Sequence, residues 1–496
     1  MSAPLEKLLR DARIDLILAR IEKDKSVINE IITHLDSEIR SIKFNSILVL
    51  GEVGLVPSDA LPKIMSCLED EDWSICREAT RSIGKIGSIA QDAVPQLSKL
   101  LGDKEESIRK EAAVALGKIG KATPESISNL IKVLNDENEE VRTEAAKALG
   151  EIGSEAYEAI PSLMKSLQDV SWAVRTASAE AISSIGKGST KAIPDLIESL
   201  GDPDWRVRYR VVNTLAEIGE PAVPDLLKAL NNKSKIVRSE AVDCLGEMNL
   251  VDQRIIEATS QLLSSYSGLV RGKAADALRS IGKEAVPSLI EAYDKVNKKM
   301  KITIISSIGG IGQDAEEAIP FLMKILVPQE EVSPFDLKKR KEQLYSKSFS
   351  SKLRGLFEEV DWLRVINLYR LLYVKRLSRS IHIKVEAVRA LGNIGKNSES
   401  IVSALEFALL NPKQVVRRAA ALSLGKMGST AYVAVPSLLQ ALGDRKPDVR
   451  WRASEALGII GVKTEDVITS LNELIHDKCD YVCESAINAL DFLVEE

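Results

Sequence analysis

The stretch Val141-Arg142-Thr143-Glu144-Ala145-Ala146-Lys147-Ala148-Leu149-Gly150-Glu151-Ile152-Gly153 decides the fold of this chain, because versions of it return thirteen times. Successive copies stand 33 or 30 residues apart, except for one step of 83 residues. A period this regular is typical of a repeat array, in which each repeat packs against its neighbours. Aligned on their closing glycines, the copies place the equivalent of Arg142, here called the Arg position, at Lys43, Cys76, Arg109, Arg142, Arg175, Arg208, Arg238, Arg271, Lys301, Lys384, Arg417, Arg450 and Cys483.

Each repeat is predicted to contain two helices. In the quoted stretch an apolar residue precedes the Arg position and a leucine or isoleucine follows it by seven residues, which places one apolar stripe on a helix. Small residues on that stripe let neighbouring helices approach closely. The closing glycine suits a left-handed helix cap. The other helix opens at a proline such as Pro194, which fits a first helical turn.

An acidic turn precedes most copies. An Asp in this turn is expected to cap the following helix and to face the guanidinium of its own or the next repeat, which would help to set the stacking register. The aspartates that lie six residues before an Arg position are Asp70, Asp103, Asp136, Asp169, Asp202, Asp444 and Asp477.

Paired helices, the turn Asp, Val-Arg and Ala-Leu-Gly-x-Ile-Gly together resemble HEAT repeats. The short spacing resembles in particular the HEAT-like subtype of phycobilisome (bilin) lyases. The resemblance implies an all-α, α-solenoid fold of about thirteen two-helix repeats with one helical insertion, and second helices that line its concave face. We expect an N-terminal helical cap at 1–37, repeats 1–9 at 38–327, the insertion at 328–380, and repeats 10–13 with a C-terminal cap at 381–496.

Composition and charge restrict the function classes. The net charge of −5 gives no general reason to expect nucleic-acid binding. The five cysteines are mostly far apart and suggest a reducing compartment. The N-terminus lacks an apolar signal core, and no apolar run approaches the roughly 18 residues of a membrane span. These features predict a cytoplasmic protein.

Residues that could carry catalysis are scarce. The three histidines are His34, His382 and His476, and none is followed by glutamate. His476, Cys479 and Cys483 form a loose cluster, but a zinc site needs three or four ligands, and Cys483 stands at an Arg position. We therefore expect no catalytic residue, no metal and no cofactor.

The exposed positions of the second helices are the predicted binding surface, with charge segregated along the chain. Partner-binding candidates in the acidic middle repeats are Glu217, Asp243, Glu247 and Asp276, beside Glu180. The early basic residues are Arg77, Arg81, Lys85, Lys110 and Lys118, and the late ones are Arg389, Arg418, Lys426 and Arg452. Such a groove could select a partner of complementary charge; the alternative is that these charges serve solubility. Trp73, Trp172 and Trp205 are interpreted as covers of inter-repeat turns.

The 83-residue step contains the insertion, which differs in composition from the repeats. Seven of the 21 aromatic residues lie here, and residues 338–379 hold 12 basic and 4 acidic residues. It is expected to leave the array at a turn within one repeat. Either it folds as a helical hairpin onto the solenoid, or it binds a partner, a membrane surface or a nucleic acid. Its partner-binding candidates are Lys338, Lys339, Arg340, Lys341, Trp362, Arg364, Tyr369, Arg370, Tyr373 and Arg376.

The function hypothesis that follows is a non-enzymatic scaffold or adaptor, which binds an unidentified protein partner through its concave helix faces and the insertion. The resemblance also implies an alternative, a bilin lyase or chromophore-chaperone subunit that acts on a phycobiliprotein. A nucleic-acid-binding array is a third hypothesis, and contact with a membrane surface is not favoured.

Overall fold

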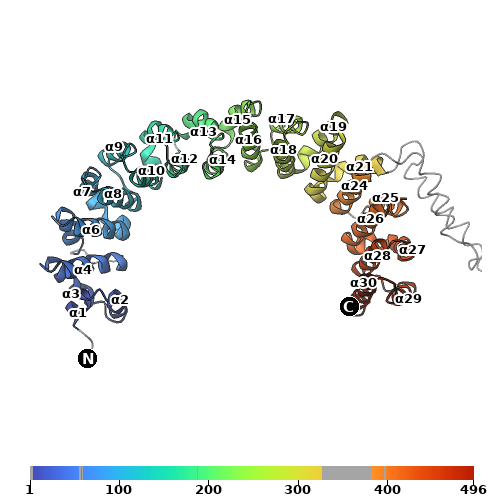
Figure 1. Ribbon diagram of the computed structural model, residues 1–496, viewed down its shortest axis with the longest axis horizontal. Coiled ribbons are helices and arrows are strands. Elements are labelled where there is room, and N and C mark those ends of the chain that lie inside the picture. Colours follow the sequence, from blue (N-terminus) through green and yellow to red (C-terminus); the bar gives the residue numbers. More distant parts are fainter. Residues whose placement is uncertain are drawn as a thin grey trace, which may run out of the picture. The chain divides into compact units, whose positions relative to one another are not determined.

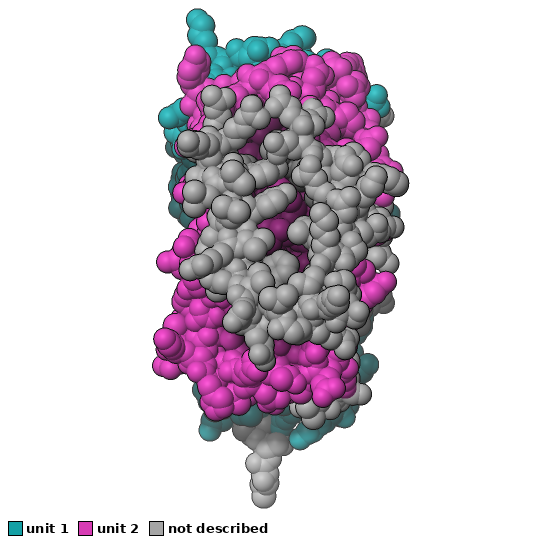
Figure 2. Space-filling model, turned by 90° about the vertical axis from the view of Figure 1, so that its right-hand side faces the viewer, with its two compact units in different colours: residues 1–248 teal, residues 249–496 magenta. Residues whose placement is uncertain are grey.

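The computed structural model describes residues 4–54, 57, 60–186, 188–326, 381–395 and 398–495. Every regular element in these residues is an α-helix or a short 3-10 helix, and the predicted all-α solenoid is confirmed. The chain forms two compact units, residues 1–248 and 249–496, which Figure 2 shows in different colours. The repeat count did not predict this division. It falls where α16 ends without the usual glycine, at Met248, and where Asn249 adopts a left-handed φ of 49°.

Unit 1 starts with α1 (Leu5–Arg10) and α2 (Ile14–Lys23). Both pack against α4, which is the second helix of the first repeat. Its first helices are α3 (Val27–Thr33), α5 (Ala60–Ser66), α7 (Val94–Leu100), α9 (Pro124–Val133), α11 (Ile160–Ser166), α13 (Ile193–Ser199) and α15 (Val223–Ala229). Its second helices are α4 (Arg40–Val53), α6 (Trp73–Ile86), α8 (Glu106–Ile119), α10 (Glu139–Ile152), α12 (Trp172–Ile185), α14 (Trp205–Ile218) and α16 (Lys235–Glu247). The 3-10 helices of the turns are η1 (His34–Asp36), η2 (Cys67–Glu69), η3 (Gly87–Ala93), η4 (Gly153–Ala159), η5 (Ser189–Ala192) and η6 (Glu220–Ala222).

Unit 2 repeats the same plan. Its first helices are α17 (Gln253–Leu262), α19 (Val286–Lys295), α21 (Ile319–Leu326), α25 (Glu399–Leu409), α27 (Val435–Leu442) and α29 (Glu465–Leu474). Its second helices are α18 (Gly268–Ile281), α20 (Lys298–Ile311), α24 (Ile381–Ile394), α26 (Gln414–Lys426), α28 (Pro447–Ile460) and α30 (Asp480–Glu495). Its 3-10 helices are η7 (Gly282–Ala285), η8 (Gly312–Ala318) and η9 (Gly428–Ala434).

Within each unit the helices form two layers (Figure 1). Each second helix packs against the next second helix of its unit, and first helices such as α7 and α9 pack against one another in the other layer. The apolar stripe of the quoted stretch forms the core between the layers: Val141 and Leu149, for example, are buried. Figure 1 shows the second-helix layer of unit 1 on the inner side of its curve, the side that the resemblance implies.

The two glycines that close the quoted stretch do different work. Gly153 follows α10 with a φ of 73°, a conformation that residues with a Cβ rarely adopt, and so it ends the helix. The other glycine lies inside the helix and lets the next second helix approach. A Cβ added to Gly150 would lie 3.0 Å from Cα of Ala181, and one added to Gly84 would lie 2.9 Å from Cα of Ala115. Close approach of second helices therefore depends on this inner glycine.

A ladder of Arg–Asp ion pairs connects successive repeats. Arg142 donates from Nε and Nη2 to the two carboxylate oxygens of Asp169, both at 2.8 Å, and from Nη1 to the backbone carbonyl of Asp136 in its own turn. The carboxylate partner thus belongs to the next repeat. The other pairs with this two-point geometry are Arg109–Asp136, Arg175–Asp202, Arg417–Asp444 and Arg450–Asp477.

The expectation that the turn Asp caps the following helix was wrong. Asp136 accepts the backbone N–H of Asn138, two residues on, and Asn138 is the residue whose side chain caps α10. The short Asp side chain lies too far before the helix to reach its first free N–H groups, so it closes the turn instead.

In the repeats around residues 208–271, other contacts replace the two-point Arg–Asp pair. Asn232 stands where other repeats have the turn Asp, and Arg208 pairs with Glu240 at 3.3 Å. Arg238 donates to the backbone carbonyl of Asn232, and Arg271 donates to that of Ser265, each within its own turn and each at 2.6 Å. The inter-repeat ion pair is therefore a property of particular repeats and not of the fold as a whole.

Residues 327–380 lie outside the described residues. Helix α21 ends at Leu326 and α24 begins at Ile381, and α24 packs against both α21 and the preceding second helix α20. Helix α21 is the first helix and α24 the second helix of one repeat, so residues 327–380 stand between these two helices in the sequence. The predicted binding residues in the segment, Lys338, Lys339, Arg340, Lys341, Trp362, Arg364, Tyr369, Arg370, Tyr373 and Arg376, also lie outside the described residues.

Candidate binding surface

An aromatic patch, consisting of Trp172, Trp205 and Tyr209, is exposed on the neighbouring second helices α12 and α14. The exposed fractions of these residues are 41%, 65% and 61%. The guanidinium of Arg206 lies 3.5 Å from the centre of the Trp172 ring. Tryptophan, tyrosine and arginine are the residues enriched at the energetic centres of protein interfaces. The aromatic patch is therefore the strongest candidate for a contact surface in unit 1.

Asp204 determines how the patch is presented, because its side chain caps α14. One carboxylate oxygen accepts the backbone N–H of Arg206 at 2.9 Å, and the other accepts Nη2 of the same residue at 2.6 Å. These hydrogen bonds from Arg206, the side-chain one first, lower the pKa of Asp204 to about 2. The carboxylate is consequently charged at neutral pH and holds Arg206 over Trp172.

The four predicted acidic residues fall in both units. Glu217 lies at the end of α14 and accepts a hydrogen bond from the Ser183 hydroxyl of α12, and Glu247 is exposed at the end of α16. Asp243 is half-buried on α16. Asp276 belongs to unit 2, where it pairs with Arg279 at 3.0 Å on α18. Unit 1 thus brings three of the four residues to neighbouring second helices.

The early basic residues do not form a free positive surface. Arg81 pairs with Glu111 of the next repeat at 2.9 Å, and Lys110 pairs with Glu140 at 2.6 Å. Lys85 pairs with Glu52 of the preceding repeat at 2.5 Å. Acids on neighbouring repeats therefore balance much of this charge, and the predicted contrast between basic and acidic repeats is weaker than the sequence indicates.

Two of the late basic residues, Arg389 and Lys426, line a hollow of about 110 Å³ between α20, α24 and α26 in unit 2. Arg389 pairs there with Glu386 at 2.7 Å, and Lys426 donates to the Asn393 side chain at 3.1 Å. Gly309 lies at its wall. The Glu386 carboxylate balances Arg389, whereas Lys426 donates to a neutral amide and keeps its charge, so the hollow is polar and carries little net positive charge.

The family model for HEAT repeats matches residues 28–117, 61–138, 127–203, 193–258 and 431–491, which is more than half of the chain. The model for the PBS lyase HEAT-like repeat matches residues 270–295 and 416–444. The chain belongs to the HEAT-repeat family. No curated protein sequence matches it.

Solved structures match the chain at low sequence identity. An engineered protein is 20% identical, with 94% of this chain and 98% of that chain covered and a TM-score of 0.31. A structure of Kap95p with RanGDP gives 12% identity, 95% and 72% coverage and a TM-score of 0.42. The complex of CpcE and CpcF of phycocyanin lyase from Nostoc sp. PCC7120 is 22% identical, with 50% of this chain and 94% of that chain covered and a TM-score of 0.31. Every one of these TM-scores lies below 0.5, so the matches carry no functional assignment.

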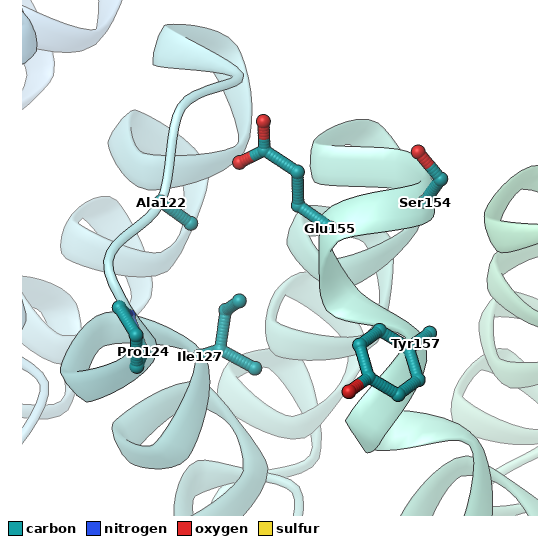
Figure 3. Close-up of a pocket in the computed structure, with 6 residues that line it drawn as sticks. All are labelled: Ala122, Pro124, Ile127, Ser154, Glu155 and Tyr157. Carbon is teal, nitrogen blue, oxygen red and sulfur yellow. The ribbon is translucent and has the colours of Figure 1, made fainter.

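Another hollow of this HEAT array, of about 400 Å³, lies between α9 and η4 in unit 1. Figure 3 shows Ile127 and Tyr157 on either side of the open space, with the Glu155 carboxylate towards Ala122. The lining combines one carboxylate with hydroxyls and apolar side chains.

The loose sequence cluster of His476, Cys479 and Cys483 lies within the described residues. Within the described parts of the chain, no three His, Cys, Asp or Glu side chains come together in a way that could hold a metal ion. The Cys483 thiol instead donates to the backbone carbonyl of Asp477 at 3.1 Å. Among the residues that the structure describes, no helix is long and apolar enough to cross a membrane.

We expect two of the five thiols to react in the native protein. Cys67, Cys76 and Cys244 are buried, and burial raises the pKa of each thiol, that of Cys76 to about 11. Cys479 and Cys483 are partly exposed. Titration with a chromogenic disulfide reagent at pH 8 should give two fast thiols in buffer and five in denaturant. Three or more fast thiols in buffer would show that a buried cysteine is accessible.

Sequence reasoning did not single out Tyr209 and Arg206. Trp73, Trp172 and Trp205 were interpreted as covers of inter-repeat turns, and all three side chains are exposed, Trp205 the most. A signal was present: Trp205 and Tyr209 are four residues apart on one helix and therefore adjacent on its surface. Arg206 over Trp172 joins two repeats, and helix periodicity within one repeat does not reveal such a contact.

Proposed function

We propose that this HEAT-repeat chain is a non-catalytic scaffold that holds a protein partner on the exposed faces of its second helices and with segment 328–380, and that it works in the cytoplasm. The aromatic patch carries the proposal. The side chains of Trp205 and Tyr209 are 65% and 61% exposed, and such exposed apolar surface lowers solubility. A partner that covers the two rings removes their apolar area from water, which favours binding. Repeat arrays commonly use such extended surfaces for binding.

Capture of the partner from an extract of the native organism tests the proposal. We expect the tagged wild-type chain to retain a stoichiometric protein, identified by mass spectrometry, and the double variant Trp205→Ala/Tyr209→Ala to lose at least ten-fold of it, since interface aromatics contribute most of the binding energy. The matched control is Tyr432→Ala, which removes an equally exposed tyrosine, at 62%, from η9. Equal losses in the double variant and the control would reject the patch.

Deletion of residues 328–380 tests the second element of the proposal. We expect the repeats on either side to keep their helical circular dichroism, because α24 packs against both α20 and α21. A short linker in place of the segment joins Val327 to Ile381. We expect capture of the partner to weaken, and unchanged capture would remove the segment from the proposed interface.

A second candidate function is a bilin lyase or chromophore-chaperone subunit, which the matches to the PBS lyase HEAT-like repeat at residues 270–295 and 416–444 favour. Co-expression with a phycobiliprotein and its bilin discriminates the two functions. Covalent chromophore attachment or transfer that depends on this chain would support the lyase, whereas its absence would leave the scaffold.

A further inference from the structure

The aromatic patch already binds one cation of its own chain. Arg206 lies over the Trp172 ring, and its charge is balanced by Asp204 behind it. Cations are attracted to the faces of aromatic rings, most strongly to tryptophan. Trp205 and Tyr209 are more exposed than Trp172, at 65% and 61% against 41%. Their rings are therefore open to side chains of a partner.

The patch continues into a polar stripe along α14. Trp205, Tyr209, Asn213 and Glu217 follow one another at intervals of four residues, so they occupy one face of the helix with a gradual turn around it. The rise of a helix gives this stripe a length of roughly 18 Å from aromatic to acidic end. A bound segment that follows α14 would meet aromatic rings first and a carboxylate last.

The acidic end contradicts the usual placement of charge on helices. Glu151, Glu217 and Glu247 are the last or last but one residues of α10, α14 and α16. The carbonyl end of a helix carries partial negative charge and favours cations. In α6 and α8 the same position holds Lys85 and Lys118, which fit that rule, and in α4 it holds Glu52, whose carboxylate is balanced by Lys85. Carboxylates at the end of α10, α14 and α16 therefore cost stability locally, and such costs are typical of binding surfaces.

We infer that the α10–α16 face of unit 1 binds a basic, amphipathic segment of the partner protein. Apolar side chains of the segment pack on Trp205 and Tyr209, and its lysines or arginines bind Glu217 and Glu247. The helix ends and the carboxylates add their negative potentials at one edge, so charge complementarity selects a cationic occupant. The inference rests on the proposed scaffold function and specifies the chemistry of its partner.

A pair of synthetic helical peptides tests the inference on the full chain. One probe is an 18-residue peptide of leucine and lysine, and the other replaces every lysine by glutamate. Fluorescence anisotropy of the labelled probes should show that the leucine–lysine peptide binds at least ten-fold more tightly, and that added salt weakens its binding. We expect the double variant Glu217→Lys/Glu247→Lys and the double variant Trp205→Ala/Tyr209→Ala each to lose ten-fold or more of that affinity.

The matched control is the double variant Glu198→Lys/Asp195→Lys on α13, which makes the same change in net charge on the first-helix layer. It should bind the leucine–lysine peptide like wild type. Equal affinity for both peptides, or equal losses in the control and the α14–α16 variant, would overturn the inference. If Trp205 and Tyr209 are needed to capture the cellular partner but the lysine peptide is not preferred, the scaffold function stands and the basic partner is rejected.

Discussion

Arg417→Ala is expected to destabilise the repeats around it by about 3–5 kcal/mol, the usual cost of leaving one member of a buried ion pair without its partner. The side chains of Arg417 and Asp444 are 1% and 6% exposed, and two hydrogen bonds of 2.6 and 2.8 Å join them. Arg417 also donates to the backbone carbonyl of Asn411 at 2.9 Å. The variant therefore removes the contact between two turns together with the charge that balances Asp444.

The next residue supplies the control. Arg418 pairs with Asp448 at 3.6 Å, with side chains 42% and 37% exposed, so Arg418→Ala should cost less than about 1 kcal/mol. Repeat arrays can unfold in parts, so we would measure amide hydrogen exchange of α26 and α27 together with denaturant unfolding of the whole chain. If the two variants cost the same, the ladder contributes no more than an ordinary surface ion pair.

Gly84→Ala is expected to destabilise unit 1 by about 1–3 kcal/mol, although alanine is the better helix former by about 1 kcal/mol. The new Cβ would lie 2.9 Å from Cα and 3.1 Å from Cβ of Ala115 on the next second helix. The nearest atom, Cα of Ala115, belongs to the backbone and cannot rotate away as a flexible side chain can, so the two helices must move apart to make room. Overpacking then outweighs the gain in helix propensity.

Gly272→Ala is expected to stabilise unit 2, the opposite of the effect expected for Gly84→Ala. Gly272 lies inside α18 with open space around its Cα, and its substitution meets no atom within 4 Å. We expect a gain of about 0.5–1 kcal/mol in the free energy of unfolding of unit 2. Thermal unfolding of both variants against wild type measures the contrast. A stabilising Gly84→Ala would show that the second helices tolerate a wider separation.

Features that depend on residues close together in the sequence were predicted well. Apolar spacing predicts the second helices, and glycines such as Gly153 predict where they end, because helix periodicity and caps involve contacts over a few residues. The 83-residue step corresponds to the interval between α21 and α24, whose residues lie outside the described ones. Of the residues on the candidate surface, Glu217 and Glu247 were named from the sequence, whereas the exposure of Trp205 and Tyr209 was not predicted.

The sequence by itself determined that this chain is an array of two-helix repeats, and it identified the single interval that differs. Tertiary structure decided which groups meet across repeats: the pairing of Arg142 with Asp169 of the next turn, the neutralisation of Lys110 by Glu140, and the exposed aromatic patch on α12 and α14. The physical reason is distance along the chain. Contacts about 30 residues apart depend on how far one repeat is displaced and turned from the next, and a periodic pattern repeats without specifying that displacement.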